Sequence, residues 1–590
     1  MLIMEANMMG KEAPVQSISK CNACVPWHHL PKGAVTDRQH KNKKTCGLHK
    51  EENMFFWYNL SMTSTQINQE NYSVFQPYML LDFTYSYEKN VDKCDLSRTV
   101  MEIMERIDLN KYIDLHNYDK RAYHPGMMLA CIILAFANGG YASLRELEEL
   151  CKYDLRFRAI TNNVVPSYKA FERFINKRLK KSIRDISKDI FLFMNEKKEL
   201  EKETLYVDGT KFEANANKMT FVWKAWKKRY MPRHWQRCMN IISNINRYFK
   251  KNDIDVRYSI IKTMSIEYLI EIDERLEEWL KANECIRQGR GKHEIAKLCD
   301  ELKKSAIKLW EYAIHGDILG ERNSYSKTDP DATFMHMKYD YYNHTNVFKP
   351  GYNVQIGVVR GYVSSVYISS DGNDMKTLIP LTESYKKEYG VYPNVVVADA
   401  GYGSYENYSY CQSKGIEGIL KYSGYEKKKE KVNDKNRYRS IHFKKDENKI
   451  PICPEGHRFT LEDVKVRMVG VYPKTTKYYR NEHCRECPYR NKCTTSKRGR
   501  TVQVTPKLER EHERIDETLE TARGKEYMSH RSTDTEGTFG DIKKNFEYVR
   551  LNRRGESGVE VEINLVIIGH NIRRYHNEKM RKLRNEQKKN

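Results

Sequence analysis

Apolar runs of strand length alternate with turn residues in the middle of the chain. The runs at 352–359 (YNVQIGVV) and 362–369 (YVSSVYIS) flank Arg360-Gly361, which predicts a β-hairpin. The run at 394–404 (NVVVADAGYGS) is typical of a buried strand that ends in an acid and continues into a Gly-rich turn and a helix. These runs predict part of a β-sheet.

Further predicted elements surround these strands. The turn at 371–374 (DGND) predicts the start of a helix near 375–388. The segments 203–208 (ETLYVD) and 416–420 (IEGIL) predict two more strands. Two antiparallel strands, a helix, a strand ending in an acid and another helix follow one another. This order predicts an α/β fold, a mixed sheet with a functional site at the strand tips.

Residues 90–185 have the pattern of several short helices. The apolar run at 127–137 is too short to span a bilayer and is typical of a buried helix. Ser143 and Glu146 predict a capping box that starts a helix at 144–152. The last helix of the group has a strongly basic end. The group fits either a helix-turn-helix-like DNA-binding module or a plain helical bundle with a basic solvated face.

A long polar helical stretch follows the first predicted strand. Aromatic and cationic residues alternate at 223–237, and we expect Lys227, Lys228 and Arg229 to contact DNA phosphates. The alternative interpretation is an amphipathic helix that buries its Trp side chains. Residues 266–313 contain few helix breakers and predict a helical hairpin inserted into the fold.

Two groups of Cys residues stand apart from the remaining thiols. The later group could bind one structural zinc ion and consists of Cys453, Cys484, Cys487 and Cys493. The alternative is a set of reduced thiols in a basic loop. The earlier group consists of Cys21, Cys24, Cys46 and His49. Few apolar residues surround it, which favours a poorly ordered or spurious leader over a zinc module.

The charge balance indicates the kind of partner. Lys and Arg outnumber Asp and Glu, 103 to 79, which gives a formal net charge of +24 and a pI near 9.2. Such an excess favours a polyanion, most commonly nucleic acid. The chain begins without a basic segment followed by an apolar one, so we expect no export signal and no membrane partner, and we expect reduced thiols or metal ligands rather than disulfides.

Three acids occupy positions suited to a metal centre. Asp208 follows the first predicted strand, Asp399 follows the buried strand, and Glu536 lies on a helix predicted at 531–546. Carboxylates bind Mg²⁺ or Mn²⁺, and a pair of such ions can activate an attacking oxygen and stabilise a leaving one in phosphodiester chemistry. The apolar face of the helix turns Glu536 toward the sheet. Lys543 lies on the same face, where it could contact a DNA phosphate.

Several segments together resemble bacterial insertion-sequence transposases with a ribonuclease-H-like catalytic domain. The matching segments are YVDGTKFEANANK at 206–218, DPDATFMHMK at 329–338, KPGYNVQIGVV at 349–359, VVVADAGYGSYENYSYC at 395–411 and RSTDTEGTFGDIKKNF at 531–546. Their order, spacing and context all agree with that family. The helical block at 121–180 resembles the N-terminal domain of the same transposases.

The resemblance implies a reaction and a set of site residues. It implies that Asp208, Asp399 and Glu536 form a DDE triad that binds Mg²⁺ or Mn²⁺. It implies binding of terminal inverted repeats in double-stranded DNA, metal-dependent cleavage, and transfer of the freed 3′-hydroxyl to target DNA. Related groups also have a Tyr-Arg-Glu-Lys signature. Tyr527 and Arg531 stand in that order here as candidate DNA-binding residues, with Tyr–Arg and Arg–Glu gaps each one residue longer than usual.

The resemblance also implies a homodimer in the active complex and a location in the bacterial cytoplasm, at the nucleoid. Two other classes share these acids, namely a ribonuclease-H-like structure-specific DNA nuclease and an inactive transposase-derived DNA-binding protein. The pattern and the resemblance divide the chain into five regions. These are a leader at 1–61, a helical N-terminal DNA-binding domain at 62–200, a first part of the catalytic core at 201–422 with a helical insertion at about 213–320, a Cys-rich insertion at 423–525, and a last part of the core with a basic C-terminal helix at 526–590.

Overall fold

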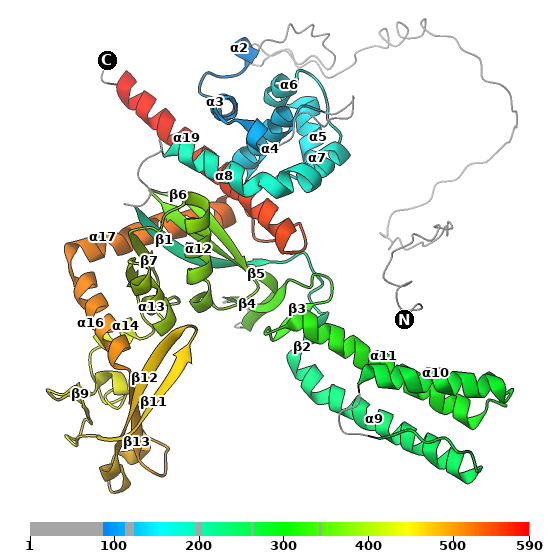
Figure 1. The fold of residues 1–590 in the computed structure, drawn as a ribbon. Helices are drawn as coiled ribbons and strands as arrows, with labels where there is room; N and C mark the ends of the chain where they lie inside the picture. Colours follow the sequence, from blue (N-terminus) through cyan, green and yellow to red (C-terminus); the bar gives the residue numbers. More distant parts are fainter. Residues whose placement is uncertain (1–86, 113–122, 196–202, 261–264, 341–344, 589–590) are drawn as a thin grey trace, which may run out of the picture. The chain divides into compact units, whose positions relative to one another are not determined.

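A computed structural model gives the fold of the chain (Figure 1). It describes residues 87–112, 123–195, 203–260, 265–340 and 345–588. The predicted leader at 1–61, with its group of three Cys and one His, lies outside the described residues.

A six-stranded mixed sheet forms the centre of the fold, and it confirms the predicted mixed α/β class. Its strands are β1 (Thr204–Glu213), β4 (Thr333–Asp340), β5 (Thr345–Val359), β6 (Tyr362–Ser369), β7 (Val395–Ala398) and β8 (Glu417–Leu420). The order is β4-β5-β1-β7-β8, and β6 also pairs with β5. β5 is antiparallel to β1, β4 and β6, whereas β7 is parallel to both β1 and β8.

Local sequence explains two features of this sheet. The β5–β6 hairpin turns through Arg360 and Gly361, which both have positive φ angles of 53° and 82°. Two such residues give the turn twist that matches the flanking strands. All four residues of β7 are buried, and they read Val-Val-Val-Ala because a central parallel strand is covered on both faces.

The first strand is longer than the sequence pattern predicted. We expected it to end at Asp208, but β1 continues to Glu213 because its second half pairs with β5, with Asp208 opposite Ile356. The parallel pairing of β1 with β7 stops earlier, at Tyr206. Polar residues in the second half of β1 concealed this pairing in the sequence. Asp208 therefore lies inside a strand, beyond the point where β1 and β7 cease to pair.

Helices cover the sheet. They include α12 (Leu378–Tyr389), α13 (Tyr405–Ser413), α16 (Pro506–Glu520) and α17 (Ala522–Arg531). α12 contacts β5 and β6, α13 and α16 contact β8, and α17 contacts β1 and β7. α16 buries Ile515 and Leu519 in the main hydrophobic core. We therefore group α16 with the core, although the sequence pattern placed it in the Cys-rich insertion.

A helical block precedes the sheet in the chain. Its main helices are α3 (Leu96–Arg106), α4 (Pro125–Gly139), α5 (Leu144–Tyr153), α6 (Leu155–Thr161), α7 (Tyr168–Phe174) and α8 (Lys180–Met194). The predicted capping box of Ser143 and Glu146 is present at the start of α5. α4 is buried along most of its length, as predicted, and packs against the C-terminal helix α19 (Glu556–Gln587). Gly569 of α19 faces the backbone of Phe136 so closely that a Cβ would lie 2.6 Å from its carbonyl carbon.

Helix length and hydropathy also bear on membrane insertion. Within the described residues, no single helix is long and apolar enough to cross a membrane. The bent pair α4 and α5 passes that test only when the two helices are taken together.

Two insertions interrupt the core along the chain. The first contains α9 (Lys224–Lys251), α10 (Ile266–Ala282) and α11 (Glu294–Leu319), which lie side by side in Figure 1 and share a hydrophobic core of their own. The predicted helical hairpin corresponds to α10 and α11, and α9 joins them. At its base, β2 (Phe221–Trp223) pairs with β3 (Ser324–Ser326).

The second insertion is built on a small antiparallel sheet. Its strands are β11 (Thr460–Val469), β12 (Tyr472–Asn481) and β13 (Arg500–Val504), in that order. A small core lies beside it and includes Phe459, Tyr479 and Val502, with Cys453 and Cys493 packed against it.

Candidate active site

Two of the three predicted acids belong to neighbouring strands, Asp208 within β1 and Asp399 directly after β7. The parallel register pairs Tyr206 of β1 with Val397 of β7. Asp208 and Asp399 each follow two residues after these positions. Because parallel strands place their carboxyl ends at the same edge, the two carboxylates meet there. Backbone N–H groups orient both side chains, since Gly209 donates to Asp208 Oδ1 at 2.9 Å and Gly401 donates to Asp399 Oδ1 at 2.8 Å.

The environment of Asp208 brings the third acid into the same centre. Burial raises the pKa of Asp208, the charges of Asp399 and Glu536 add to the rise, and the Gly209 N–H and Arg531 oppose it, which leaves a pKa of about 6. Desolvation penalises an ionised carboxylate, and nearby negative charges add to that penalty. Asp208, Asp399 and Glu536 are therefore close enough to interact electrostatically.

Glu536 lies on a helical segment with an irregular pitch. The segment begins with α17, and a π-helical turn at Ser532–Glu536 follows Arg531 directly. A π-turn accommodates one extra residue, so side chains five apart come to the same face. Arg531 accordingly donates to Glu536 Oε1 at 2.7 Å. The long Arg–Glu gap in the sequence is absorbed by this turn.

The orientation of Glu536 differs from the prediction in one respect. Its side chain is 55% exposed, whereas that of Arg531 is only 12% exposed. The predicted apolar face is present, with Phe539 and Ile542 buried in the main core. Thr535, which is fully buried, holds the position next to Asp208. The helix therefore docks on the sheet through Thr535 and the apolar face, and Glu536 remains at the accessible edge.

The predicted DNA-contacting residues of this helix have protein partners. Lys543 donates to Thr210 Oγ1 and to the carbonyl of Lys211, both at 2.7 Å, so it is attached to the strand that carries Asp208. Tyr527 accepts a hydrogen bond from Arg523 at 2.9 Å and is half-buried against the core. Tyr527 lies in α17, before Glu536, and Lys543 lies after Glu536 in the same helical segment.

The aromatic and basic segment of α9 is divided between core and surface. Trp235 packs against the core of the helical insertion, whereas Trp226 is 46% exposed. Lys228 and Arg229 are exposed, while Lys227 is half-buried beside α11. The segment therefore buries one Trp side chain, as in an amphipathic helix, and also exposes basic side chains, as the DNA-contact interpretation requires.

The chain matches models of known protein families. Two models of a transposase DDE domain match residues 322–452 and 452–576, and a model of a transposase domain (DUF772) matches residues 85–177. The chain belongs to the insertion-sequence DDE transposases. Asp399 and Glu536 lie within the matched ranges, and Asp208 lies outside them. No curated protein and no solved structure matches the chain.

The Cys-rich insertion of the transposase brings its four thiols into one region. Burial raises the pKa of Cys493, and the charges of Cys484, Cys487 and Cys453 raise it further. The backbone N–H of His457 donates to Cys453 Sγ at 3.3 Å, and the rings of His457 and His483 stack beside the cluster. No three of these thiols and rings, as described, lie within 4.8 Å of one another.

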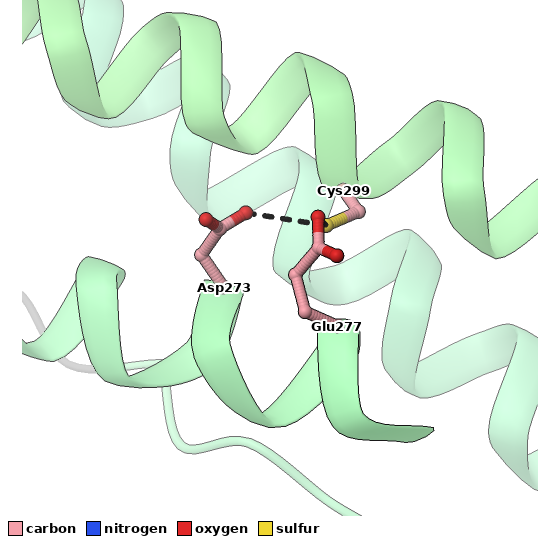
Figure 2. A group of neighbouring side chains, drawn as sticks. All are labelled: Asp273, Glu277 and Cys299. Atoms are coloured by element: carbon pink, nitrogen blue, oxygen red, sulfur yellow. Dashed lines mark hydrogen bonds between the residues drawn. The ribbon is translucent and has the colours of Figure 1, made fainter. Parts of the chain in front are cut away.

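One group of three ligating side chains does lie within that distance in the described part of the transposase. Asp273 and Glu277 of α10 face Cys299 of α11 (Figure 2). The sequence pattern did not single them out, although acids four residues apart share one helix face. Lys303 approaches Asp273 at 3.7 Å, and Arg287 pairs with Glu277. Because both carboxylates have cationic partners and the Cys299 thiol donates to Asp273, the group serves as a packing contact between two helices.

Sequence reasoning also missed a buried polar group beneath the acids. Asn353 and Gln355 of β5 are fully buried, and both donate to Asp374, which we had interpreted only as a turn residue. The signal was present in the sequence, since two amides interrupt an otherwise apolar strand.

Proposed function

We propose that this transposase binds the terminal inverted repeats of its element and catalyses metal-dependent DNA cleavage and strand transfer on a ribonuclease-H-like core. The observation that carries the proposal is the convergence of Asp208, Asp399 and Glu536 from two neighbouring strands and an adjoining helix. The mixed sheet is consistent with that core. A transposase family supplies DNA as the substrate, and the net charge of +24 suits that partner.

The three acids would hold the divalent cations. All three offer carboxylate oxygens, the donors that Mg²⁺ and Mn²⁺ prefer over nitrogen or sulfur. When bound, such cations activate an attacking oxygen and stabilise a leaving one. Burial of Asp208 in a poorly hydrated position strengthens its attraction for a cation, because water competes less for the charge.

Arg531 has a separate role in this proposal. It holds Glu536 by a hydrogen bond and lies 3.9 Å from Asp208, so it offsets the repulsion between the acids. Its Nε atom is buried and has no hydrogen-bond partner among the described residues. A guanidinium donor left unpaired inside a protein is costly. A phosphate oxygen of bound DNA would satisfy it.

DNA binding beyond the centre would use the remaining basic surfaces. The helical block before the sheet would act as a DNA-binding domain, and Lys228 and Arg229 of α9 would contact phosphates. Tyr527 and Lys543 would position the strand near the acids. A homodimer would bring two transposon ends together. The four Cys of the second insertion would bind one structural zinc ion, with the small sheet closing around it.

Cleavage assays on DNA that carries the element's inverted repeats test the proposal. We expect the purified chain to cut at the repeat ends with Mg²⁺ or Mn²⁺ and to join the product to target DNA. Asp399→Asn and Glu536→Gln should lose both steps but bind the repeats with unchanged affinity. Glu526→Gln is the matched control, because Glu526 is an exposed acid on the same helical segment.

Three outcomes would contradict the proposal. Full cleavage by Asp399→Asn would remove the acids from the mechanism. Cleavage without joining would identify a structure-specific nuclease on the same fold. Binding without any cleavage by the wild-type chain would identify an inactive transposase-derived DNA-binding protein.

A further inference from the structure

A fourth carboxylate lies beside Asp399. Asp374 begins the short helix Asp374–Lys376 that follows β6. A Cβ placed on Gly401 would lie 3.0 Å from Asp399 Oδ1 and 3.6 Å from Asp374 Oδ2. The two acid side chains therefore approach one glycine from different elements, and their oxygens face the same small space.

The second oxygen of Asp374 is held by buried amides. Asn353 Nδ2 donates to Asp374 Oδ1 at 2.7 Å, and Gln355 Nε2 donates to the same atom at 3.0 Å. Gln355 also donates to Asn353 Oδ1 at 3.0 Å and accepts from the hydroxyl of Tyr402. Oδ1 thus accepts from two protein donors, which fixes the carboxylate and leaves Oδ2 beside Gly401, where Asp399 Oδ1 also lies.

This polar group reaches Asp208 as well. Gly209, the residue after Asp208, pairs with Gln355 across β1 and β5. A Cβ on Gly209 would lie 2.1 Å from Gln355 Nε2, so the amide lies directly against this backbone. Burial raises the pKa of Tyr402, and the charges of Asp374, Asp208 and Asp399 raise it further. The buried Tyr402 phenol, which donates to Gln355, therefore lies within electrostatic range of Asp374, Asp208 and Asp399.

Burying the polar side chains of Asn353 and Gln355 carries a free-energy cost, which a role in the site would explain. Two fully buried amides have been removed from water inside an apolar sheet, with the half-buried carboxylate of Asp374 as their shared acceptor, and an unmatched donor or acceptor there costs about 1–3 kcal/mol. Apolar side chains would fill β5 without that risk. Among the described residues, no Lys or Arg forms an ion pair with Asp374, so its charge is not offset by a protein cation there.

We propose that Asp374 is a fourth acid of the catalytic centre and supports the divalent cation that Asp399 holds. It is a positioning residue, because its fixed Oδ2 would accept hydrogen bonds from the hydration shell of a cation held at Asp399. The inference rests on the proposed function, since it presupposes a cation at Asp399. Carboxylates that orient metal ligands from outside commonly change metal affinity by about 10- to 100-fold when mutated.

Mn²⁺ affinity of the full-length chain, measured by the electron paramagnetic resonance of free Mn²⁺ with repeat-end DNA present, tests the proposal. We expect Asp374→Asn to raise the Kd for Mn²⁺ by about 10- to 100-fold. Asp374→Glu, which keeps the charge, should restore part of the affinity. Asp371→Asn is the matched control, because Asp371 lies in the same turn and its side chain lies near Lys376.

The outcomes separate this inference from the proposed function. If Asp374→Asn binds Mn²⁺ like the wild type while Asp399→Asn does not, the inference is wrong and the proposed function stands. If Asp399→Asn also binds like the wild type, the metal assignment itself fails. A second measurement needs no variant. Fe²⁺ bound to the wild-type chain, with hydrogen peroxide and ascorbate added to generate hydroxyl radicals at the metal, should produce backbone cuts near residue 374 as well as near 208 and 399, and a missing cut near 374 would overturn the inference.

Discussion

Asp208 and Asp399 each lie two residues beyond Tyr206 and Val397, the last paired positions of the neighbouring parallel strands β1 and β7. This register places two carboxylates at the same edge of the sheet, although the two residues are far apart along the chain. It also buries Asp208 against Gly209 and Arg531, where an ionised carboxylate is poorly solvated. The ionised Asp208 side chain should therefore destabilise the folded protein, although the proposed metal binding requires it.

Asp208→Asn should stabilise the metal-free protein and abolish cleavage. The folded-state pKa of about 6 lies above the ordinary value of 3.8, so the ionised side chain disfavours folding at pH 8. Removing the charge should raise the free energy of unfolding by about 1–3 kcal/mol, at about 1.4 kcal/mol per pKa unit. Thermal melting in EDTA at pH 8 measures it. A lower melting temperature than that of the wild type would show that the pairing with Arg531 outweighs burial.

Gly209→Ala should disrupt the buried amides beneath the acids. The added Cβ would meet Gln355 at 2.1 Å, and displacing a buried side chain in a packed core typically costs about 1–3 kcal/mol. We expect a lower melting temperature and reduced cleavage. Gly139→Ala is the control, because a Cβ there meets nothing within 4 Å and lies on a helix. Equal melting temperatures for both variants would contradict the packing argument.

Charge reversal on α9 should weaken DNA binding in a salt-dependent way. Lys228→Glu with Arg229→Glu should lower affinity and reduce the slope of log K against log salt by about 2, since each phosphate contact contributes about 0.9. Lys250→Glu with Lys251→Glu is the matched control, on exposed residues about 30 Å further along the same helix. Fluorescence anisotropy over a salt series measures both. An equal loss in both double variants would indicate a general charge effect.

The second Cys group should carry zinc. Elemental analysis of the purified chain should find about one zinc ion per chain, and Cys484→Ser should lose it. Cys285→Ser, which changes a half-buried thiol of the helical insertion, is the control and should retain the metal. Wild-type protein purified without chelators and free of zinc would leave reduced thiols as the correct interpretation of this group.

Glu388 should make stability depend on pH away from the catalytic acids. Burial raises its pKa to about 7, with Arg184 and Ser384 opposing the change. The folded chain then binds a proton that the unfolded chain releases between pH 4.5 and 7, so this contribution to stability is lost as pH rises through 7. Glu388→Gln should flatten the melting temperature over that range, whereas Glu426→Gln, at an exposed side chain, should not. An unchanged pH profile for Glu388→Gln would contradict the burial argument.

The sequence by itself determined the features that depend on neighbours along the chain. A continuous Val-Val-Val-Ala run followed by an acid identified β7 and Asp399, since only a strand covered on both faces is so uniformly apolar. The apolar face at Phe539 and Ile542 identified the docked helix. The net charge indicated a polyanionic partner, and the quoted motifs indicated the transposase family.

Only the tertiary structure decided the features that depend on pairing between distant segments. Asp208 lies within β1 rather than at its end, because the strand is extended by pairing with β5, which lies about 150 residues further along the chain. The π-turn before Glu536 restores a contact with Arg531 that regular helical spacing would not give. Asp374 lies beside Gly401 and Asp399 because amides on the distant strand β5 hold its carboxylate. Each case has the same physical reason: strand register and helix pitch respond to partners that local periodicity does not record.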